Sequence, residues 1–282
     1  MKFNSKNADI FVPDGTPFEE ALKRTTHLCI VAHQDDSEIA AYHGIAECFG
    51  QKELWFSSVI VTDGAGSPRA GVYCDYSDEE MKVIRKQEQK KAAFVGEYSV
   101  QIQLCYPSAM VKDHAEKGIV EDLKNIIMAC HPKIVYLHNP ADKHDTHVSA
   151  FLRSLEALRA VSDKFIPEKV YGCEVWRDFD WLMDDEKVVL PVSKYKNLSA
   201  SLLGVFDSQI TGGKRYDLAA AGRRLANATF YASHSTDVDD ALTYAIDLIP
   251  LVKDPSLKVD DFVLSKIDMF KNDVKSRLAK FS

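Results

Sequence analysis

The chain has 282 residues, of which 46% are hydrophobic and 27% are charged, and its formal net charge is -7. This composition is typical of a soluble globular protein with enough apolar residues for a substantial core. The acidic balance argues against a nucleic-acid partner, because phosphate binding needs clustered lysine and arginine. No apolar leader opens the chain, and no run approaches the roughly 20 apolar residues of a membrane span. We therefore expect a cytoplasmic protein.

Short runs rich in β-branched residues alternate with helical patterns over the first two thirds of the chain. The strand-like runs are residues 27–32, 54–62, 100–106, 133–138 and 169–176. Between two of them, Ile119, Leu123 and Ile126 recur at helical spacing. This alternation predicts an α/β fold with a mostly parallel sheet and helices on both faces. Ligands of such sheets bind beyond the carboxyl ends of the strands.

The C-terminal third is less regular and contains no internal repeat. Helical patterns occur in "KYKNLSASLLGVF" and in "YDLAAAGRRLANATFYASH", and the polar-rich tail after Pro250 predicts a peripheral helix or two. We therefore expect one domain over 1–282. An α/β core at 27–180 should carry the functional site, and a helical extension at 181–282 should complete the cleft.

The strand-like run at 27–32 leads directly into a histidine and three acidic residues. They are His33, Asp35, Asp36 and Glu38. An aspartate followed three residues later by a glutamate is also a common helix start, so helix capping would account for the acidic residues. Capping does not account for His33.

A second polar cluster follows another strand-like run. The loop after residues 133–138 holds Asp142, His144, Asp145 and His147. Parallel strands deliver their carboxyl ends to one edge of a sheet, so the two clusters can lie in the same place. Together they predict a single metal site built from histidine and carboxylate side chains.

The chemistry of these side chains favours zinc over calcium. Two imidazoles and one carboxylate with room for water form the open arrangement of hydrolytic zinc sites, whereas calcium takes oxygen ligands. The same set also holds non-haem iron, so the metal stays open between the two. Beside such a metal, a spare carboxylate can act as a base and a spare histidine can stabilise an oxyanion. Spacing alone leaves open whether Asp35 or Asp36 binds the metal.

Two motifs resemble the signature of a known family. "AHQDDSE" at 32–38 is similar to the AHPDDE motif, and "DKHDTH" at 142–147 to the second histidine motif, of the PIG-L/LmbE-like zinc-dependent de-N-acetylases. Weaker similarity in "VTDGAGSPRAG" and "IRKQEQKKAAFVG" extends the family pattern over roughly 27–180, and "DSQI" resembles a later Ser-Gln motif. The resemblance implies a Rossmann-like fold and the removal of acetyl groups from N-acetylglucosamine units or related amides.

The resemblance also implies a role for each motif residue. It makes His33, Asp36 and His147 the metal ligands. It makes Asp35 the general base, and it makes His144 the residue that stabilises the tetrahedral intermediate and assists the departure of the amine.

Three positions depart from the family pattern. Gln34 replaces the usual proline, which should loosen the loop. Thr146 stands where many relatives have an aspartate, a difference that bears on the orientation of the ligand histidine beside it. Phe206 occupies the place of a histidine two residues before the Ser-Gln motif, so no contribution of that histidine is expected here.

Other features allow weaker expectations. The loop "TDGAGSPRAG" lacks the lysine of a P-loop, and we expect a substrate loop there, with a plain loop as the alternative. Asp63 and Arg69 in this loop, together with Asp142, are candidate sugar contacts. Arg85 and Glu88 in the following helix are expected to form a structural ion pair. The aromatic residues of "EVWRDFDWL" are expected to pack in the core at a sheet edge, with stacking on a sugar as the alternative.

The leading hypothesis is a zinc-dependent hydrolase that releases acetate from an N-acetylated amino sugar or its conjugate. One alternative is a hydrolase of a non-sugar amide. The other is a catalytically silent carbohydrate-binding protein on the same fold, although metal binding alone would not require Asp35 and His144. The expected partner is a small-molecule substrate, and the sequence leaves a homo-oligomer open.

Overall fold

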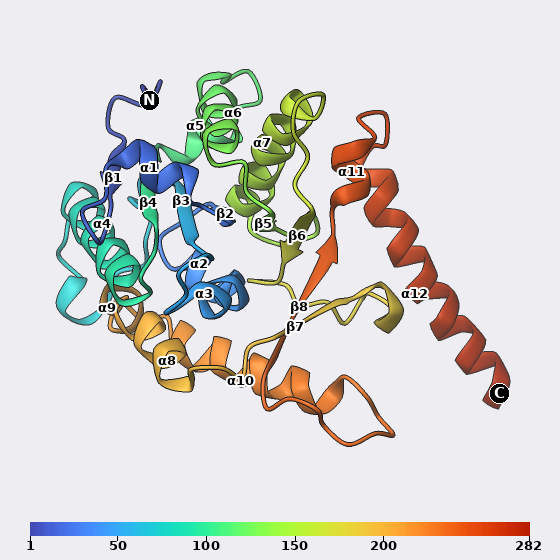
Figure 1. The fold of residues 1–282 in the computed structure, drawn as a ribbon. Coiled ribbons are helices and arrows are strands. Elements are labelled where there is room, and N and C mark those ends of the chain that lie inside the picture. Colours follow the sequence, from blue (N-terminus) through green and yellow to red (C-terminus); the bar gives the residue numbers. More distant parts are fainter.

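The computed structural model describes all 282 residues and places eight strands in one sheet, in the order β1-β4-β3-β2-β5-β6-β8-β7 (Figure 1). The strands from β4 to β6 in this order run parallel, whereas β1 pairs antiparallel with β4, and β8 pairs antiparallel with both β6 and β7. The strands are β1 (Asp9–Phe11), β2 (His27–Val31), β3 (Phe56–Thr62), β4 (Val100–Tyr106), β5 (Ile134–His138), β6 (Lys169–Cys173), β7 (Val188–Pro191) and β8 (Leu242–Asp247).

Helices cover both faces of the sheet (Figure 1). One face carries α2 (Asp36–Ala40), α3 (Tyr42–Cys48), α4 (Asp78–Val95) and α8 (Lys196–Gly204). The other carries α1 (Phe18–Lys23), α5 (Ser108–Lys112), α6 (Gly118–Cys130), α7 (Asp145–Val161), α11 (Ile249–Lys253) and the start of α12 (Val259–Phe281). The remaining helices are α9 (Asp207–Ile210), α10 (Tyr216–Phe230) and the short 3₁₀ turns Gly71–Tyr73 and Asp184–Glu186.

The central strand β2 shows why the sheet is covered on both sides. Side chains alternate along a strand, so Leu28 and Ile30 enter one core cluster while Cys29 and Val31 enter the other. All of them are buried, as expected for a parallel strand between two helical layers. The predicted α/β fold with a mostly parallel sheet is therefore confirmed.

The five strand-like runs of the sequence correspond to β2, β3, β4, β5 and β6, although β6 ends three residues before the predicted run. Strands β1, β7 and β8 were not expected. The last two lie in the segment 181–282, for which helices were predicted, and they extend the same sheet. They are short antiparallel strands at or near the sheet edge, where a period-two apolar pattern is weak.

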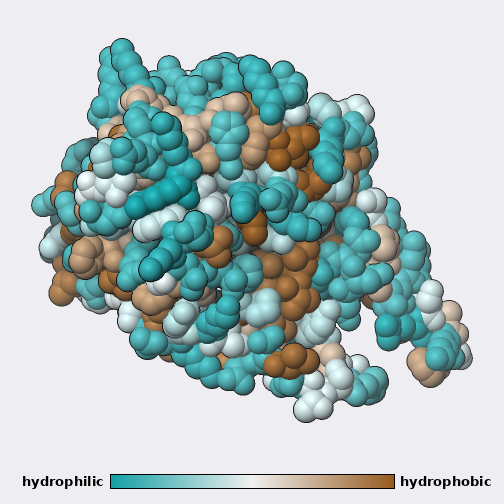
Figure 2. Space-filling view, viewed as in Figure 1, coloured by the Kyte–Doolittle hydropathy of each residue, from teal (hydrophilic) through white to brown (hydrophobic).

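Helix α12 begins on the core and then projects from the molecule, so the C-terminus lies far from the body (Figures 1 and 2). Phe262 and Val263 are its buried residues. Apolar side chains farther along, such as Leu278 and Phe281, are exposed. Neither this helix nor any other combines the length and the hydropathy that crossing a bilayer would need.

His27, at the start of β2, makes the stability of the fold sensitive to acid. Burial is the main cause that lowers the pKa of His27 to about 4 from its ordinary value of 6.5, and the residue is only 5% exposed. Between these two values the unfolded chain binds a proton that the folded chain does not. Stability is therefore lost as the pH falls from 6.5 towards 4.

We expect His27→Gln to flatten this part of the pH profile. At pH 5, wild type should have lost about 2 kcal/mol more of its unfolding free energy than the variant, relative to pH 7.5. Urea unfolding at both pH values measures the difference. His114→Gln, at an exposed position, is the control and should follow wild type. An equal loss in wild type and His27→Gln would contradict the prediction.

Candidate metal centre and cleft

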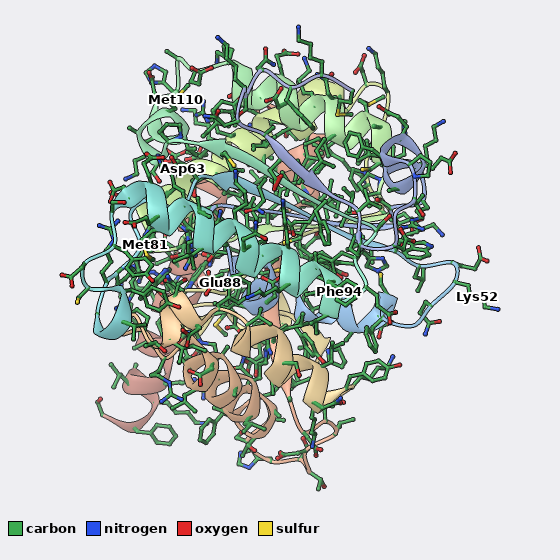
Figure 3. All side chains as sticks on the ribbon, turned by 90° about the vertical axis from the view of Figure 1, so that its left-hand side faces the viewer. Lys52, Asp63, Met81, Glu88, Phe94 and Met110 are labelled. Atoms are coloured by element: carbon green, nitrogen blue, oxygen red, sulfur yellow. The ribbon has the colours of Figure 1, made fainter.

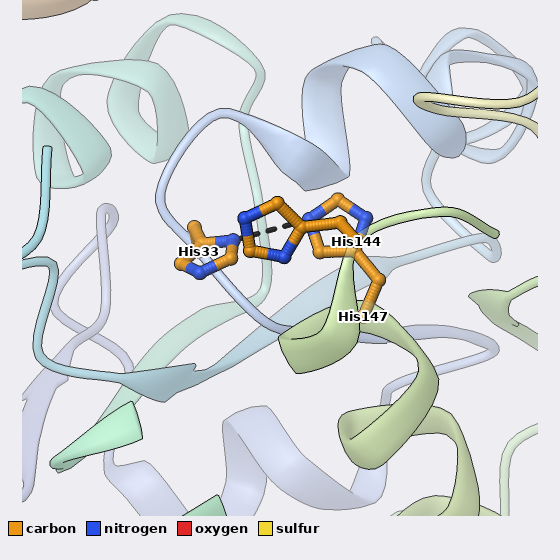
Figure 4. Close-up of side chains that lie close together, drawn as sticks. All are labelled: His33, His144 and His147. Carbon is orange, nitrogen blue, oxygen red and sulfur yellow. Dashed lines mark hydrogen bonds between the residues drawn. The ribbon is translucent and has the colours of Figure 1, made fainter. Parts of the chain in front are cut away.

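The two histidine motifs meet because their strands are neighbours. β2 pairs in parallel with β5, so the loop after each strand leaves the same edge of the sheet. His33 and Asp36 lie in the loop after β2 and at the start of α2. His147 lies in the first turn of α7, which follows β5. Figure 4 shows His33 and His147 side by side, with His144 next to them.

Three donor atoms converge at this edge. His33 Nδ1 lies 3.1 Å from His147 Nε2 and 3.2 Å from Asp36 Oδ2, and His147 Nε2 lies 3.3 Å from Asp36 Oδ2. In a tetrahedral zinc site with bonds of about 2.0–2.1 Å, neighbouring donor atoms are about 3.3 Å apart. The three atoms therefore form one face of a tetrahedron of the right size, and these residues could hold a divalent metal.

His138 also lies near this cluster, within the group Asp36, His138 and His147. Its Nε2 is 3.5 Å from Asp36 Oδ2, but the same nitrogen accepts a hydrogen bond of 2.9 Å from the backbone N–H of Ala32. That bond uses the lone pair that a metal would need. His138 therefore fixes the loop after β2 rather than completing the ligand set.

Asp142 orients His147 from behind. Its Oδ2 lies 3.3 Å from His147 Nδ1, and its Oδ1 accepts the backbone N–H of His144 at 3.0 Å. A carboxylate on the far nitrogen of a ligand histidine fixes the ring orientation and the tautomer. Both side chains are fully buried. The structure thus places Asp142 beside a candidate ligand and not on the wall of the cleft, where a sugar contact was expected.

Asp35 has an unusual backbone, and a carboxylate oxygen that makes no hydrogen bond. It adopts φ 87°, in the left-handed region that costs a non-glycine residue energy and that is often found at functional sites. Although it occupies the N-cap position of α2, its side chain makes no capping hydrogen bond, and Oδ2 is buried without a partner. The helix-cap explanation of "AHQDDSE" therefore does not hold for Asp35.

A buried arginine faces the Asp35 carboxylate. Arg85 Nη2 lies 3.6 Å from Asp35 Oδ2 and also donates to the backbone oxygen of Gln34. Burial raises the pKa of Asp35 well above its usual range, and the Arg85 charge opposes that rise. The result is a carboxyl group prepared to take up a proton near the donor cluster.

His144 lies beside the donor atoms at the wall of the cleft. Its ring centroid is 5.0 Å from that of His33 and 4.6 Å from that of His147, and its Nδ1 is buried without a partner. Burial, together with the neighbouring histidines, lowers the pKa of His144 to about 4. The ring is therefore neutral at pH 7 and can donate one N–H to a substrate oxygen or nitrogen.

The three departures from the family pattern are all buried. Gln34 donates through Nε2 to Gln103 Oε1 on β4 at 3.1 Å, so it ties the loop to the sheet instead of loosening it. Thr146 is 2% exposed beside His147. Phe206 packs in the core cluster under α8 and does not line the cleft.

The cleft at the carboxyl edge has a volume of about 290 Å³. His33, Asp35, Asp36, His144 and His147 all line it. The expected substrate loop contributes Gly64, Gly66, Ser67 and Pro68, and the "DSQI" segment contributes Gln209. Trp176 also lines the cleft, although core packing was expected for it. The lining residues that were not predicted are Ile39, Arg85, Ser108, Lys112, Val175 and Tyr216.

Asp63 and Arg69, the expected sugar contacts, lie outside this lining. Asp63 Oδ2 is 3.4 Å from Lys82 Nζ, and Arg69 pairs with Asp78 at the start of α4. The loop between them still contributes, since Ser67 and Pro68 line the cleft. The structure therefore brings the loop to the site but directs these two charged side chains elsewhere.

The expected ion pair between Arg85 and Glu88 is also absent. Arg85 points towards Asp35, whereas Glu88 accepts hydrogen bonds from the backbone N–H of Ser208, at 2.7 Å, and from its hydroxyl, at 2.5 Å. Figure 3 shows Glu88 on the side of α4 that faces the helices of the C-terminal third. Glu88 thus anchors the Ser-Gln segment and with it Gln209, whose Nε2 is buried without a partner.

Fold and site define an α/β protein with a histidine and carboxylate cluster at the carboxyl edge of a parallel sheet, inside an open cleft. Residues 28–158 match the family model described as PIG-L, GlcNAc-PI de-N-acetylase. The matched segment contains both histidine motifs. No curated protein matches the chain.

Solved structures share the fold at low sequence identity. GalB, the 4-carboxy-2-hydroxymuconate hydratase from Pseudomonas putida KT2440, has a TM-score of 0.61 and 17% identity, covering 79% of this chain and 95% of its own. The N,N'-diacetylchitobiose deacetylase from Pyrococcus horikoshii has a TM-score of 0.59 and 16% identity, covering 82% and 86%. The A40926 pseudoaglycone deacetylase Dbv21 has a TM-score of 0.58 and 15% identity, and the match covers 80% of this chain and 97% of that chain. Because these relatives include a hydratase, the fold alone does not choose the reaction.

Proposed function

We propose that this protein is a zinc-dependent hydrolase that removes the acetyl group from an N-acetylated amino sugar or its conjugate. The observation that carries the proposal is the triangle of donor atoms from His33, Asp36 and His147, 3.1 to 3.3 Å apart at the edge of the cleft. These residues belong to the two motifs of the family domain at 28–158. Iron fits the same donor set, and metal analysis separates the two metals.

In this proposal the three ligands hold the metal, which when bound polarises a carbonyl and lowers the pKa of water. Asp35 accepts the proton of the attacking water through its unpaired Oδ2, which is buried beside the donor cluster. The Arg85 guanidinium, 3.6 Å away, favours the ionised form of this carboxyl and so opposes the effect of burial.

His144 acts on the other side of the reacting carbon. Its neutral ring donates a hydrogen bond to the oxygen that becomes negative in the tetrahedral intermediate. It then assists the departing nitrogen by a hydrogen bond, while that nitrogen takes the proton that Asp35 accepted from water. Asp142 supports this position through the backbone N–H of His144. Substrate oxygen and nitrogen thus have a partner at the wall of the cleft.

Two observations argue against a silent carbohydrate-binding protein and against a hydratase. A silent carbohydrate-binding protein would gain nothing from holding Asp35 at φ 87° with an unpaired buried oxygen, an arrangement that costs stability. A hydratase, as in the solved neighbour GalB, would use a similar base to add water to a carbon-carbon double bond. The family domain favours amide hydrolysis, and nothing in these residues distinguishes a sugar amide from another amide.

A substrate panel tests the proposal. Zinc-loaded protein is incubated with N-acetylglucosamine, its glycosides, an N-acetylated amino acid and 4-carboxy-2-hydroxymuconate. We expect equal amounts of acetate and free amine from at least one amino sugar. Acetate from the amino acid alone would move the substrate class to non-sugar amides. Hydration of the muconate without acetate release would contradict the proposed reaction.

A further inference from the structure

A second cavity, about 130 Å³ in volume, continues from the cleft between α2 and α10. It shares Ile39, Val175, Trp176 and Tyr216 with the cleft. Ala219, Ala220 and Arg223 complete its lining, so every wall residue except the arginine is hydrophobic. We call this cavity the apolar groove. Since it opens into the cleft beside the donor cluster, its occupant would be part of the molecule bound there.

The opposite wall of the cleft has a different character. It is formed by polar and charged groups, among them Ser67, Arg85, Ser108 and Lys112. A substrate that fills the cleft therefore meets hydrogen-bonding groups on one side and hydrocarbon on the other. This asymmetry predicts a substrate with one polar part and one apolar part.

The apolar groove is held in a fixed shape. Arg224 on α10 is 5% exposed and donates to the backbone oxygens of Glu38 at 2.7 Å and Ile39 at 3.1 Å, which locks α10 onto the end of α2. Arg223 donates to the backbone oxygen of Val175 and fixes the opposite rim. Because the groove is already formed without a ligand, binding requires no rearrangement of α10 and none of the binding free energy is spent on one.

The position of His144 decides which half of the substrate reaches the groove. Its ring stacks against Trp176, with centroids 6.2 Å apart and an interplanar angle of 20°. Trp176 in turn meets Tyr216 edge to face at 5.8 Å. In the proposed mechanism His144 assists the leaving nitrogen, so the amine half of the substrate lies next to this aromatic wall.

We propose that the apolar groove is a subsite for an aryl or short alkyl group attached to the amino-sugar half of the substrate, that is, for an apolar aglycone. The inference rests on the proposed deacetylation and deepens it. A cavity on the order of 150 Å³ accepts a benzene ring, so one aromatic ring matches the size of the groove. Burial of such a ring strengthens productive binding on the order of tenfold or more.

Two matched substrates test the subsite. The methyl and benzyl glycosides of N-acetylglucosamine carry the same amide, and kcat/KM is measured for each with the zinc-loaded wild-type protein. We expect the benzyl glycoside to react about ten times more efficiently. As a third substrate, methyl glucosaminide bearing an N-phenylacetyl group places the same ring on the acyl half and should show no such gain.

A substitution then localises the effect. Ala219 lines the groove but not the cleft, and Ala219→Trp fills the groove from α10. We expect the ratio of the two kcat/KM values to fall to about one. Ala221→Trp places the same bulk at an exposed position of the same helix and should keep the wild-type ratio.

The outcomes separate this inference from the proposed function. No acetate from either glycoside of N-acetylglucosamine would count against the proposed function itself. Acetate release with equal kcat/KM for the methyl and benzyl glycosides would leave the function standing and overturn the subsite. A gain for the N-phenylacetyl substrate instead would overturn its assignment to the amine half. If the ratio of kcat/KM for the benzyl and methyl glycosides stayed at its wild-type value in Ala219→Trp, the benzyl ring would bind outside the apolar groove and the subsite would be overturned.

Discussion

We expect Asp35→Asn to reduce turnover by a factor on the order of 10² to 10⁴ while the protein keeps its fold and its metal. Asparagine has nearly the shape of aspartate but cannot accept a proton from water. The Asp35 carboxylate is not part of the donor triangle, and its side chain caps no helix, so the metal should stay bound without its charge. The asparagine oxygen can still face the buried Arg85 guanidinium, so the fold should be kept at some cost in stability. The loss should appear mainly in kcat, because the proton moves only in the transition state.

Metal analysis and steady-state kinetics on the same preparations measure this effect. Asp63→Asn is the matched control, since Asp63 lies outside the cleft lining and faces Lys82. That variant should retain wild-type turnover. Metal-replete Asp35→Asn with near wild-type activity would show that another group takes the proton, and Asp35 would lose its assigned role.

The second large effect is expected for a metal ligand. His147→Ala should lower the bound metal from about one ion per chain to background, and turnover should fall at least about a thousandfold, because several kcal/mol of transition-state stabilisation depend on the metal. Asp36→Asn removes a ligand charge without creating a cavity and should act in the same direction. Elemental analysis of dialysed protein, with circular dichroism to confirm folding, gives the result.

His138→Gln distinguishes the two ways of grouping the donor atoms. The glutamine oxygen can still accept the backbone N–H of Ala32, which is the bond that His138 makes in the structure. We therefore expect this variant to keep its metal. If it lost as much metal as His147→Ala while His33→Ala kept a full complement, the site would be Asp36, His138 and His147 instead.

The sequence by itself determined the sheet core and the location of the site. The apolar runs that became β2 and β5 are buried on both faces, and that pattern is readable because each strand is a nearly continuous apolar run, with a single histidine at one end. Parallel neighbours end at the same edge, so His33 and His147 had to approach each other once the two strands paired. A donor set suited to zinc or iron followed from the residue types alone.

Only the tertiary structure decided what each side chain at that edge faces. Asp35 and Asp36 are adjacent in the sequence, and the left-handed backbone at Asp35 is what turns one carboxylate towards Arg85 and the other towards the histidines. The short strands β7 and β8 were not predicted either, because a strand of few residues with a weak alternation of apolar and polar side chains gives little sequence signal.

The apolar groove depends on tertiary structure for the same reason. Ile39, Trp176 and Ala219 are far apart in the chain and meet only because Arg224 fixes α10 against α2. Contacts of this kind are set by packing between distant segments, whereas the periodicity of one segment specifies only its own helix or strand. The candidate reacting groups could therefore be named from the sequence, but the shape of the cleft around them could not.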